Sequence, residues 1–240
     1  MSAGYGFAFV VLAALAALAA VLAPEWFLRV AGAAVALSFL LVAVAYFGAG
    51  PRLLFKRANG RRHPLAWLVH WPYFAFTAFA YRLSILTSRE AEFACVAPNV
   101  LLGRRLTTRE GKCAEIEGWL AVLDLAAEMP ESRPLRERPG YRSLPVLDAT
   151  AMSLAQLRDA VEWVKRHAAT GPVYVHCALG HGRSALVAAA YLLAAGLAPD
   201  AKAAVKHLRE LRPGVRLNRP HRRLLDRFAA ETGVTSAPSA

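Results

Sequence analysis

The stretch His176–Ser184 combines residue types and spacing that could transfer a phosphoryl group. Cys177 and Arg183 stand six positions apart, with Gly180 and Gly182 between them. A glycine-containing turn can point successive backbone N–H groups at one anion, and an arginine adds a planar fork that matches phosphate oxygens. The same positive field favours the thiolate form of a cysteine, which is the nucleophile. This pattern predicts attack of Cys177 on phosphorus and a phosphocysteine intermediate.

Two elements must position this stretch. The apolar run before it predicts a strand over Pro172–His176, and Ala185–Ala195 is expected to form a helix. The N-terminus of a helix attracts anions, because its first N–H groups have no partners within the helix. The alternative for Cys177 is an inert buried thiol. The neighbouring glycines and Arg183 disfavour that alternative.

The pattern His-Cys-x-x-Gly-x-x-Arg-Ser, followed by Ala190–Leu193, resembles the signature of the dual-specificity phosphatases in the protein tyrosine phosphatase superfamily. The resemblance covers roughly residues 90–232 and points to a membrane-anchored, bacterial-type member. It implies a protein tyrosine phosphatase-like α/β fold, with a mostly parallel sheet flanked by helices.

The resemblance also implies roles for individual residues. The phosphate would be bound by Ala178, Leu179, Gly180, His181, Gly182 and Arg183. Ser184 would face the thiolate and stabilise it as a leaving group, and His176 would order the loop through hydrogen bonds. A plain helix N-cap is the alternative role for Ser184.

A proton donor is needed for the leaving oxygen. Asp148 is the best candidate, because it follows an expected strand and lies 29 residues before Cys177. Similar phosphatases place their acid in a matching Pro-x-x-Asp context. The alternative for Asp148 is a turn or capping residue. Glu128 and Glu131 are weaker candidates that could line the pocket, and Asp124 lies in an expected strand, which indicates a structural role.

No metal and no organic cofactor is expected. The histidines of the loop, His176 and His181, lack accompanying ligands with metal-site spacing. The three cysteines form no disulfide framework, and a reactive thiolate suits a reducing compartment. Cys95 and Cys113 are interpreted as core or incidental residues, with a protective disulfide to Cys177 as the alternative.

Strands and helices alternate in the second part of the chain, which favours a mostly parallel sheet covered by helices. The expected strands are Phe93–Ala97, Val100–Leu102, Trp119–Leu125, Tyr141–Val146 and Pro172–His176. The expected helices begin at Thr107 and Ser153, each with a capping residue, and cover Ala185–Ala195, Asp200–Leu211 and Arg219–Glu231. We expect a catalytic domain at 90–232 and a disordered tail at 233–240.

The first 51 residues are expected to form a transmembrane helical hairpin. Tyr5–Ala23 is an uncharged apolar run of 19 residues and Val30–Gly50 one of 21, each long enough to cross a bilayer. A signal peptide is the alternative for the first run, but no basic segment precedes it and a second apolar run follows.

The segment 52–89 is basic and aromatic, and is expected to lie at the membrane interface. Arg52, Lys56, Arg57, Arg61 and Arg62 follow the second run and predict a cytoplasmic flank. The aromatic stretch Leu65–Leu86 is interpreted as an interfacial amphipathic segment. Its alternatives are a third span, which would move the catalytic domain across the membrane, and a segment packed on that domain. The favoured location is therefore the cell inner membrane, multi-pass, with a cytoplasmic catalytic domain.

The net charge of +12 fits anionic lipid or phosphorylated substrates. No nucleic-acid-binding motif accompanies it, which disfavours that partner. The sequence thus predicts a membrane-anchored phosphatase acting on phosphoproteins at Tyr, Ser or Thr. The alternatives are a lipid phosphate phosphatase, of phosphatidylglycerophosphate or phosphoinositide type, and a binding module that captures phosphates without turnover. The oligomeric state is left open.

Overall fold

The computed structural model describes residues 3–116, 118–119 and 121–232, so the expected disordered tail lies outside the described residues. The chain divides into two compact units. The N-terminal unit comprises residues 1–57, 61–88 and 127–130, and the sheet unit comprises residues 58–60, 89–126 and 131–240.

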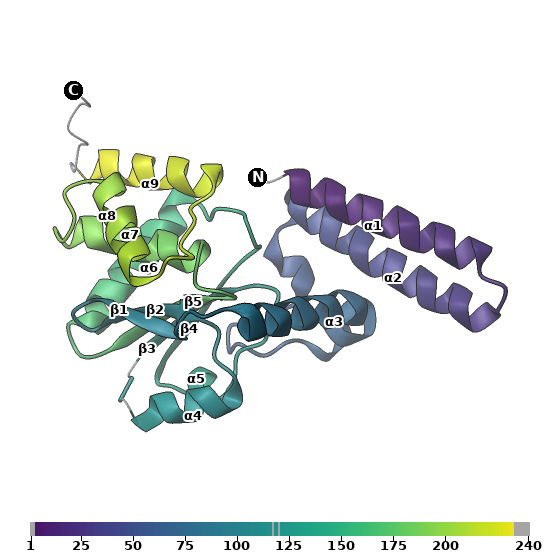
Figure 1. Cartoon of the computed structure of the whole chain (residues 1–240), viewed down its shortest axis with the longest axis horizontal. Helices are drawn as coiled ribbons and strands as arrows, with labels where there is room; N and C mark the ends of the chain where they lie inside the picture. The colour runs from purple at the N-terminus through teal and green to yellow at the C-terminus, as the bar shows by residue number, and fades with distance from the viewer. Residues whose placement is uncertain (1–2, 117, 120, 233–240) are drawn as a thin grey trace. The chain divides into compact units, whose positions relative to one another are not determined.

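The N-terminal unit begins with two long apolar helices joined by a short link. Helix α1 (Ala3–Leu22) and helix α2 (Trp26–Val44) run antiparallel (Figure 1). A π-helical turn, η1 (Ala45–Ala49), extends α2, and the 3-10 turn η2 (Pro51–Leu54) follows. Gly4–Leu22 and Trp26–Ala49 are long and apolar enough to cross a membrane, with mean hydropathies of 2.5 and 2.3. This arrangement fits the expected hairpin.

The aromatic segment of the N-terminal unit forms one helix, α3 (Pro64–Thr87), which continues through Pro72. Trp71 and Phe79 are exposed on it. Arg62, just before α3, is only 7% exposed. Its guanidinium lies 3.3 Å from the centre of the Phe74 ring and donates a hydrogen bond to the Glu128 carbonyl at 2.6 Å. Arg62 is therefore a buried cation packed on an aromatic ring.

The sheet unit is built on a five-stranded mixed sheet in the order β1-β2-β5-β3-β4. Its strands are β1 (Phe93–Ala97), β2 (Val100–Arg104), β3 (Ala121–Ala126), β4 (Gly140–Val146) and β5 (Val173–Cys177). Only the β1–β2 pair among them is antiparallel; β2–β5, β5–β3 and β3–β4 are parallel. The expected mostly parallel sheet is confirmed. Because β5 is central, Cys177 emerges in the middle of its carboxyl edge.

Helices cover both faces of this sheet. On one face lie α6 (Leu154–Ala168), α7 (Arg183–Ala194), α8 (Ala201–Leu211) and α9 (Arg219–Glu231). On the other lie α4 (Thr108–Ile116) and α5 (Arg133–Arg136) (Figure 1). Ser153 and Gln156 form the capping box of α6, as the sequence predicts, and Thr107 and Glu110 exchange hydrogen bonds in the same way at α4.

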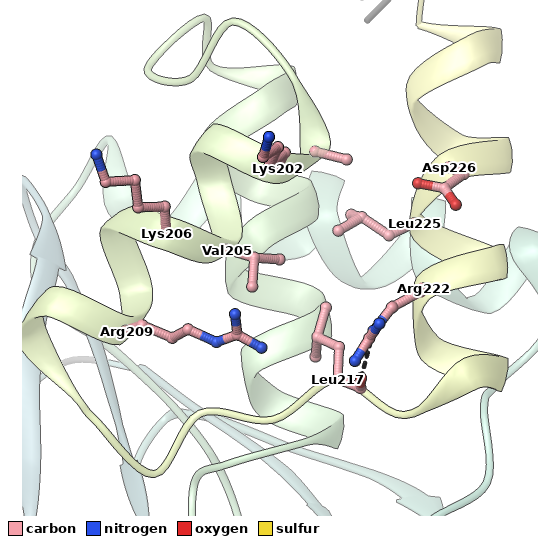
Figure 2. Close-up of a pocket in the computed structure, with 9 residues that line it drawn as sticks. Lys202, Val205, Lys206, Arg209, Leu217, Arg222, Leu225 and Asp226 are labelled. Carbon is pink, nitrogen blue, oxygen red and sulfur yellow. Dashed lines mark hydrogen bonds between the residues drawn. The ribbon is translucent and has the colours of Figure 1, made fainter. Parts of the chain in front are cut away.

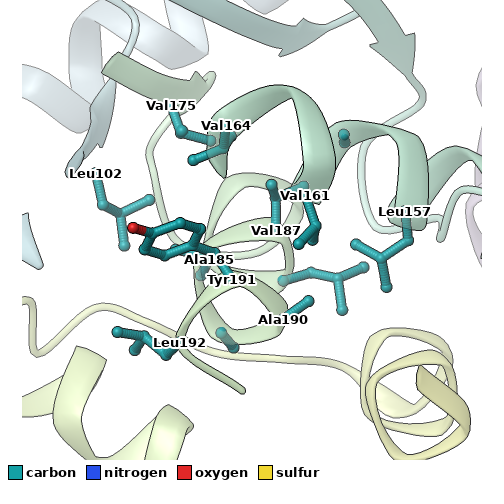
Figure 3. Close-up of a cluster of buried hydrophobic side chains, with 14 of the residues drawn as sticks. Leu102, Leu157, Val161, Val164, Val175, Ala185, Val187, Ala190, Tyr191 and Leu192 are labelled. Carbon is teal, nitrogen blue, oxygen red and sulfur yellow. The ribbon is translucent and has the colours of Figure 1, made fainter. Parts of the chain in front are cut away.

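Alternation along β5 determines what each face of the central strand contacts. Val173, Val175 and Cys177 join the main hydrophobic core, which packs against α7 and its neighbours (Figure 3). Tyr174 joins a smaller cluster on the other face with Trp119. His176 follows Tyr174 by two positions and therefore belongs to that second face. Its ring stacks on the Tyr174 ring at 5.2 Å between centroids.

Two local expectations are corrected. Trp119 was expected to begin a strand, but β3 begins at Ala121, and Trp119 is a buried residue that stacks on Tyr174 at 4.5 Å. Cys95 and Cys113 are both exposed and all three cysteines are free. Their exposure excludes the core interpretation and leaves the incidental one.

Candidate active site

The thiol of Cys177 lies at the carboxyl end of β5 and is 3% exposed. Two donors face its sulfur. The hydroxyl of Ser184 donates to the Cys177 Sγ at 3.2 Å, and the backbone N–H of Gly180 donates to it at 3.3 Å. Gly180 has φ +80°, a left-handed conformation that favours glycine, and a Cβ there would lie 2.5 Å from the Gly103 carbonyl oxygen. The turn thus needs glycine to aim this N–H at the sulfur.

Ser184 is not a helix cap. Helix α7 begins at Arg183, its N-cap is Gly182, and no side chain caps it. Ser184 is fully buried within the first turn. The N-cap alternative is therefore wrong, because the helix starts two residues earlier than that role requires. Its hydroxyl is instead committed to the Cys177 sulfur.

These donors affect the ionisation of the thiol. Burial by itself raises the pKa of Cys177, because it penalises the thiolate. The charge of Arg183 and the hydrogen bonds from Ser184 act in the opposite direction, and the nearby Asp148 opposes them weakly. The net result is a pKa of Cys177 below its ordinary value. The site therefore favours the nucleophilic form of this cysteine.

Arg183 and Asp148 meet beside the thiol. A guanidinium nitrogen of Arg183 lies 3.0 Å from an Asp148 carboxylate oxygen, and the other terminal nitrogen donates to the Val146 carbonyl at 2.7 Å. The Arg183 side chain is 1% exposed, whereas that of Asp148 is 59% exposed. The arginine is thus held in a fixed orientation. The Asp148 carboxylate reaches Arg183 from a solvent-facing loop, where an incoming substrate could contact this carboxylate.

The loop that carries Asp148 is tied to the start of α9. Asn218 donates from its side-chain amide to the Ala149 carbonyl at 2.7 Å, and its oxygen caps α9 through the His221 N–H at 3.0 Å. The His221 ring nitrogen Nε2 lies 2.8 Å from the Thr150 carbonyl, which requires Nε2 to carry the proton. Burial lowers the pKa of His221, the hydrogen bond to the Thr150 carbonyl acts against it, and the charge of Arg183 lowers the pKa further.

His176 lies beneath the loop and contacts a buried carboxylate. Its Nε2 lies 2.8 Å from a Glu131 oxygen, both side chains being fully buried, and its Nδ1 lies 3.2 Å from the Cys177 carbonyl. Burial alone would lower the pKa of His176. The charge and hydrogen bond of Glu131, with help from Asp124, raise it above its ordinary value. The His176–Glu131 pair therefore holds the backbone of Cys177 in place from the buried side of the loop.

Asp124, Glu131 and His176 form the one grouping among the described residues whose ligand atoms are close enough to hold a metal, within 4.8 Å of one another. Their atoms are already engaged with protein groups. Asp124 accepts hydrogen bonds from the Tyr141 hydroxyl at 2.7 Å and from the Ala126 N–H at 3.0 Å. As folded, this cluster is a hydrogen-bonded support for β3, β4 and β5.

A second network supports the loop from outside. His181 contacts a Glu90 oxygen at 2.6 Å, and the other Glu90 oxygen accepts from the Gly214 N–H. Arg212, 2% exposed, donates to the Ala91 carbonyl at 2.9 Å and lies 3.3 Å from Glu90. It also contacts the Leu179 carbonyl at 3.4 Å. The loop is therefore held between Arg212 on one side and the His176 pair on the other.

Comparison with known families gives one match. The catalytic-domain family of the dual-specificity phosphatases matches residues 107–231, which is more than half of the chain. The chain belongs to the dual-specificity phosphatase family. No curated protein matches the chain.

Solved structures show the same fold as this phosphatase. Tk-PTP in its active form is 26% identical with a TM-score of 0.52, over 58% of this chain and 97% of that one. PTPMT1 in complex with PI(5)P is 20% identical with a TM-score of 0.53, over 60% of this chain and 97% of that one. Human DUSP28 is 22% identical with a TM-score of 0.51, over 60% of this chain and 96% of that one. This chain is accordingly a dual-specificity, protein tyrosine phosphatase-like hydrolase.

The structure of the phosphatase brings together the site residues that the sequence predicts. The structure places Ser184 against the Cys177 thiol and Asp148 against Arg183. His176 lies on the buried side of the loop, next to Glu131. The expectation that Glu131 lines the pocket is wrong, because its side chain is fully buried against His176. Glu128, the other weak candidate for the acid, belongs to the N-terminal unit.

Sequence reasoning missed four residues of the phosphatase site, namely Glu90, Arg212, Asn218 and His221. Asn218 carried one local signal, since it precedes a helix start and is a common N-cap residue. The other three act through tertiary contacts and carry no signal of their own.

Proposed function

We propose that this phosphatase is membrane-anchored and hydrolyses phosphomonoesters of phosphoproteins through a phosphocysteine on Cys177. The observation that supports it most directly is the convergence of two donors on the Cys177 sulfur beside the Arg183–Asp148 pair. A nucleophile, an anion-binding fork and a proton donor then stand within reach of one phosphoryl group.

In the first step, the Cys177 thiolate attacks phosphorus and the phosphorus–oxygen bond to the substrate breaks. The phosphoryl oxygens bind Arg183 and the N–H groups of Ala178–Gly182, which stabilises charge on the equatorial oxygens. The phosphate displaces Asp148 from Arg183, which leaves the carboxyl group beside the leaving oxygen. That carboxyl gives its proton to the leaving oxygen.

In the second step, water attacks phosphorus and gives its proton to Asp148. The phosphorus–sulfur bond breaks, and inorganic phosphate leaves. The departing sulfur takes the electron pair and becomes a thiolate, which the Ser184 hydroxyl stabilises from its observed distance of 3.2 Å. No metal or organic cofactor is required by these steps.

Replacing Asp148 by asparagine tests this assignment. The variant keeps an oxygen that Arg183 can bind but removes the proton donor. We expect hydrolysis of alkyl phosphates to slow by about 10²- to 10³-fold, and that of nitrophenyl phosphate by much less, because a good leaving group needs no proton. Steady-state and burst kinetics over a series of leaving groups measure the difference.

Asp159→Asn is the matched control. Asp159 is also an exposed carboxylate paired with an arginine, Arg142, but away from the thiol. It should leave every rate within about twofold of the wild type. Wild-type hydrolysis of alkyl phosphates by Asp148→Asn would show that the acid is another residue.

A lipid phosphate is the second candidate substrate. Two apolar helices of the chain are long enough to cross a membrane, and a tethered site meets phospholipid head groups at high local concentration. The same fold holds PI(5)P in PTPMT1. Membrane phosphoproteins would be concentrated in the same way, and substrate trapping with Cys177→Ser distinguishes the two candidates.

The third candidate, a binding module without turnover, has less support. A module that only captured phosphate would need neither a thiol of lowered pKa nor a carboxylate beside the arginine, and both are present. Hydrolysis of an aryl phosphate by the wild type distinguishes the two. Phosphate binding with no turnover at any pH would favour the module.

We infer that the protein lies in the cell inner membrane as a multi-pass protein with its sheet unit in the cytoplasm. A hairpin places both of its ends on one side of the membrane. The cluster Arg52, Lys56, Arg57 and Arg61 follows the hairpin, which favours a cytoplasmic side. A reducing compartment also suits a reactive thiolate. Segment 52–89 would lie along the interface.

The exposed cysteines of the sheet unit allow this topology to be tested with the native chain. Cys95 and Cys113 should react with a membrane-impermeant maleimide only after cells are permeabilised. A cysteine placed at Glu25, an exposed residue in the link between α1 and α2, should react in intact cells. Reaction of Cys95 and Cys113 in intact cells would place the sheet unit outside the cytoplasm and contradict this topology.

A further inference from the structure

A cavity of about 440 Å³ lies between α8 and α9, apart from the Cys177 site. Its apolar wall is formed by Val205 of α8, by Leu217 in the connection between the helices and by Leu225 of α9 (Figure 2). Leu217 and Leu225 are almost fully buried, whereas Val205 is partly exposed. An anion or a wholly polar ligand would not need such a wall.

Two exposed arginines line the same cavity, and each is held by one hydrogen bond to the backbone. Arg209 donates from Nε to the Val215 carbonyl at 3.1 Å, and Arg222 donates from Nε to the Leu217 carbonyl at 2.8 Å. Figure 2 shows the two side chains approaching Leu217 from α8 and from α9. Within the described part of the chain, neither arginine forms an ion pair with a carboxylate. Their terminal nitrogens are therefore available to bind an anion, and the backbone contacts orient them in advance.

Two lysines add to the positive charge. Lys202 and Lys206 are exposed, lie one turn apart on α8 and line the cavity with the arginines (Figure 2). Lys206 has only a loose contact with Glu210, at 3.9 Å. The cavity lining contains one carboxylate, Asp226, against these four cations. The ligand that complements this lining is anionic at one end and apolar at the other.

We propose that this cavity binds an anionic phospholipid. The phosphodiester lies at Arg209 and Arg222, and the glycerol and first acyl carbons lie on Val205, Leu217 and Leu225. A lipid is favoured over an acidic peptide because the chain carries two helices long enough to cross a bilayer, which hold the sheet unit near anionic head groups. The inference rests on the proposed membrane attachment and is independent of the proposed reaction.

Photocrosslinking in nanodiscs tests the site with the full chain. The discs contain phosphatidylcholine and a small fraction of phosphatidylglycerol carrying a diazirine near its glycerol. Phosphatidylglycerol is a phosphodiester, and orthovanadate is added to occupy the Cys177 site. Crosslinked peptides are then mapped. We expect label on residues 201–226, displaced by unlabelled phosphatidylglycerol and not by phosphatidylcholine.

Charge variants show whether the cavity itself is responsible. Lys202→Gln with Lys206→Gln should lower the label on residues 201–226 by about tenfold, because each cation near an anionic surface strengthens binding several-fold. The control Lys112→Gln with Lys165→Gln removes the same charge from exposed positions on α4 and α6, and should change the label less than twofold. Aryl phosphatase activity, unchanged in both pairs, reports correct folding.

Three results would overturn the proposal, and each is distinguishable from failure of the proposed function. Label confined to α1, α2 and α3 would confirm the membrane attachment but exclude the cavity as a lipid site. Equal label on residues 201–226 in the Lys202/Lys206 variant and in the Lys112/Lys165 control would mean that charge outside the cavity attracts the lipid. Displacement of the lipid by an acidic phosphopeptide at lower concentration than phosphatidylglycerol would assign the cavity to a peptide.

Discussion

Substitution of Cys177 by serine is expected to lower turnover of aryl phosphates by roughly 10⁴-fold or more, the scale seen when a catalytic nucleophile is removed. A serine hydroxyl stays protonated where the thiol ionises. The features that lower the pKa of Cys177, which are Arg183 and Ser184, cannot bring an alcohol into the ionised form at neutral pH. No phosphoenzyme should be detected after acid quench, whereas the wild type should give one.

The same variant should retain its substrate, because Arg183 and the loop N–H groups are unchanged. Cells that express it can be analysed for retained phosphoproteins and accumulated phospholipids together, which separates the two candidate substrates. Cys113→Ser is the matched control, since it removes an exposed thiol away from the site and should keep full activity. Substantial turnover by Cys177→Ser would exclude the phosphocysteine route.

Replacement of Arg183 by lysine should lower kcat/KM by about 10³-fold. A lysine keeps the charge but cannot form a planar fork, and arginine contacts to a transferring phosphoryl group contribute about 10³- to 10⁵-fold. It also lacks the two separate terminal nitrogens with which Arg183 contacts the Val146 carbonyl at 2.7 Å and Asp148 at 3.0 Å. Phosphate or vanadate inhibition constants measured alongside kcat/KM should show weakened anion binding.

Arg212→Lys provides the control for this prediction. Arg212 is equally buried and contacts the same loop through the Leu179 carbonyl, but it lies on the outer side of the loop. We expect Arg212→Lys to lower the thermal stability of the enzyme while costing much less activity. Equal losses of activity in both variants would mean that Arg183 acts by holding the fold rather than by binding phosphate.

The sequence predicts the centre of the fold well, because local signals there agree with one another. The apolar run at β5, the glycines at 180 and 182 and the apolar helix α7 each indicate the same strand–turn–helix unit. Asp148 is the candidate acid because it follows an expected strand in a Pro-x-x-Asp context. The structure places its carboxylate 3.0 Å from the Arg183 guanidinium.

What the sequence could not predict depends on packing between distant segments. Glu131 looks like a loop carboxylate in the sequence, and only the fold shows that it is buried against His176. Asn218 and His221 act on the Asp148 loop because α9 packs beside it, about seventy positions later in the chain. The boundary of α7, which decided the role of Ser184, is likewise fixed by its buried packing.

The contacts of Glu90 determine where the chain can be truncated without damaging the active site. The matched family region starts at residue 107, whereas Glu90 contacts His181, Gly214 and Arg212, and β2 pairs with β5 along its length. A shortened protein designed to the family boundaries would remove two strands and leave Arg212 buried without its carboxylate. A soluble catalytic fragment should therefore begin before Glu90, at the end of α3.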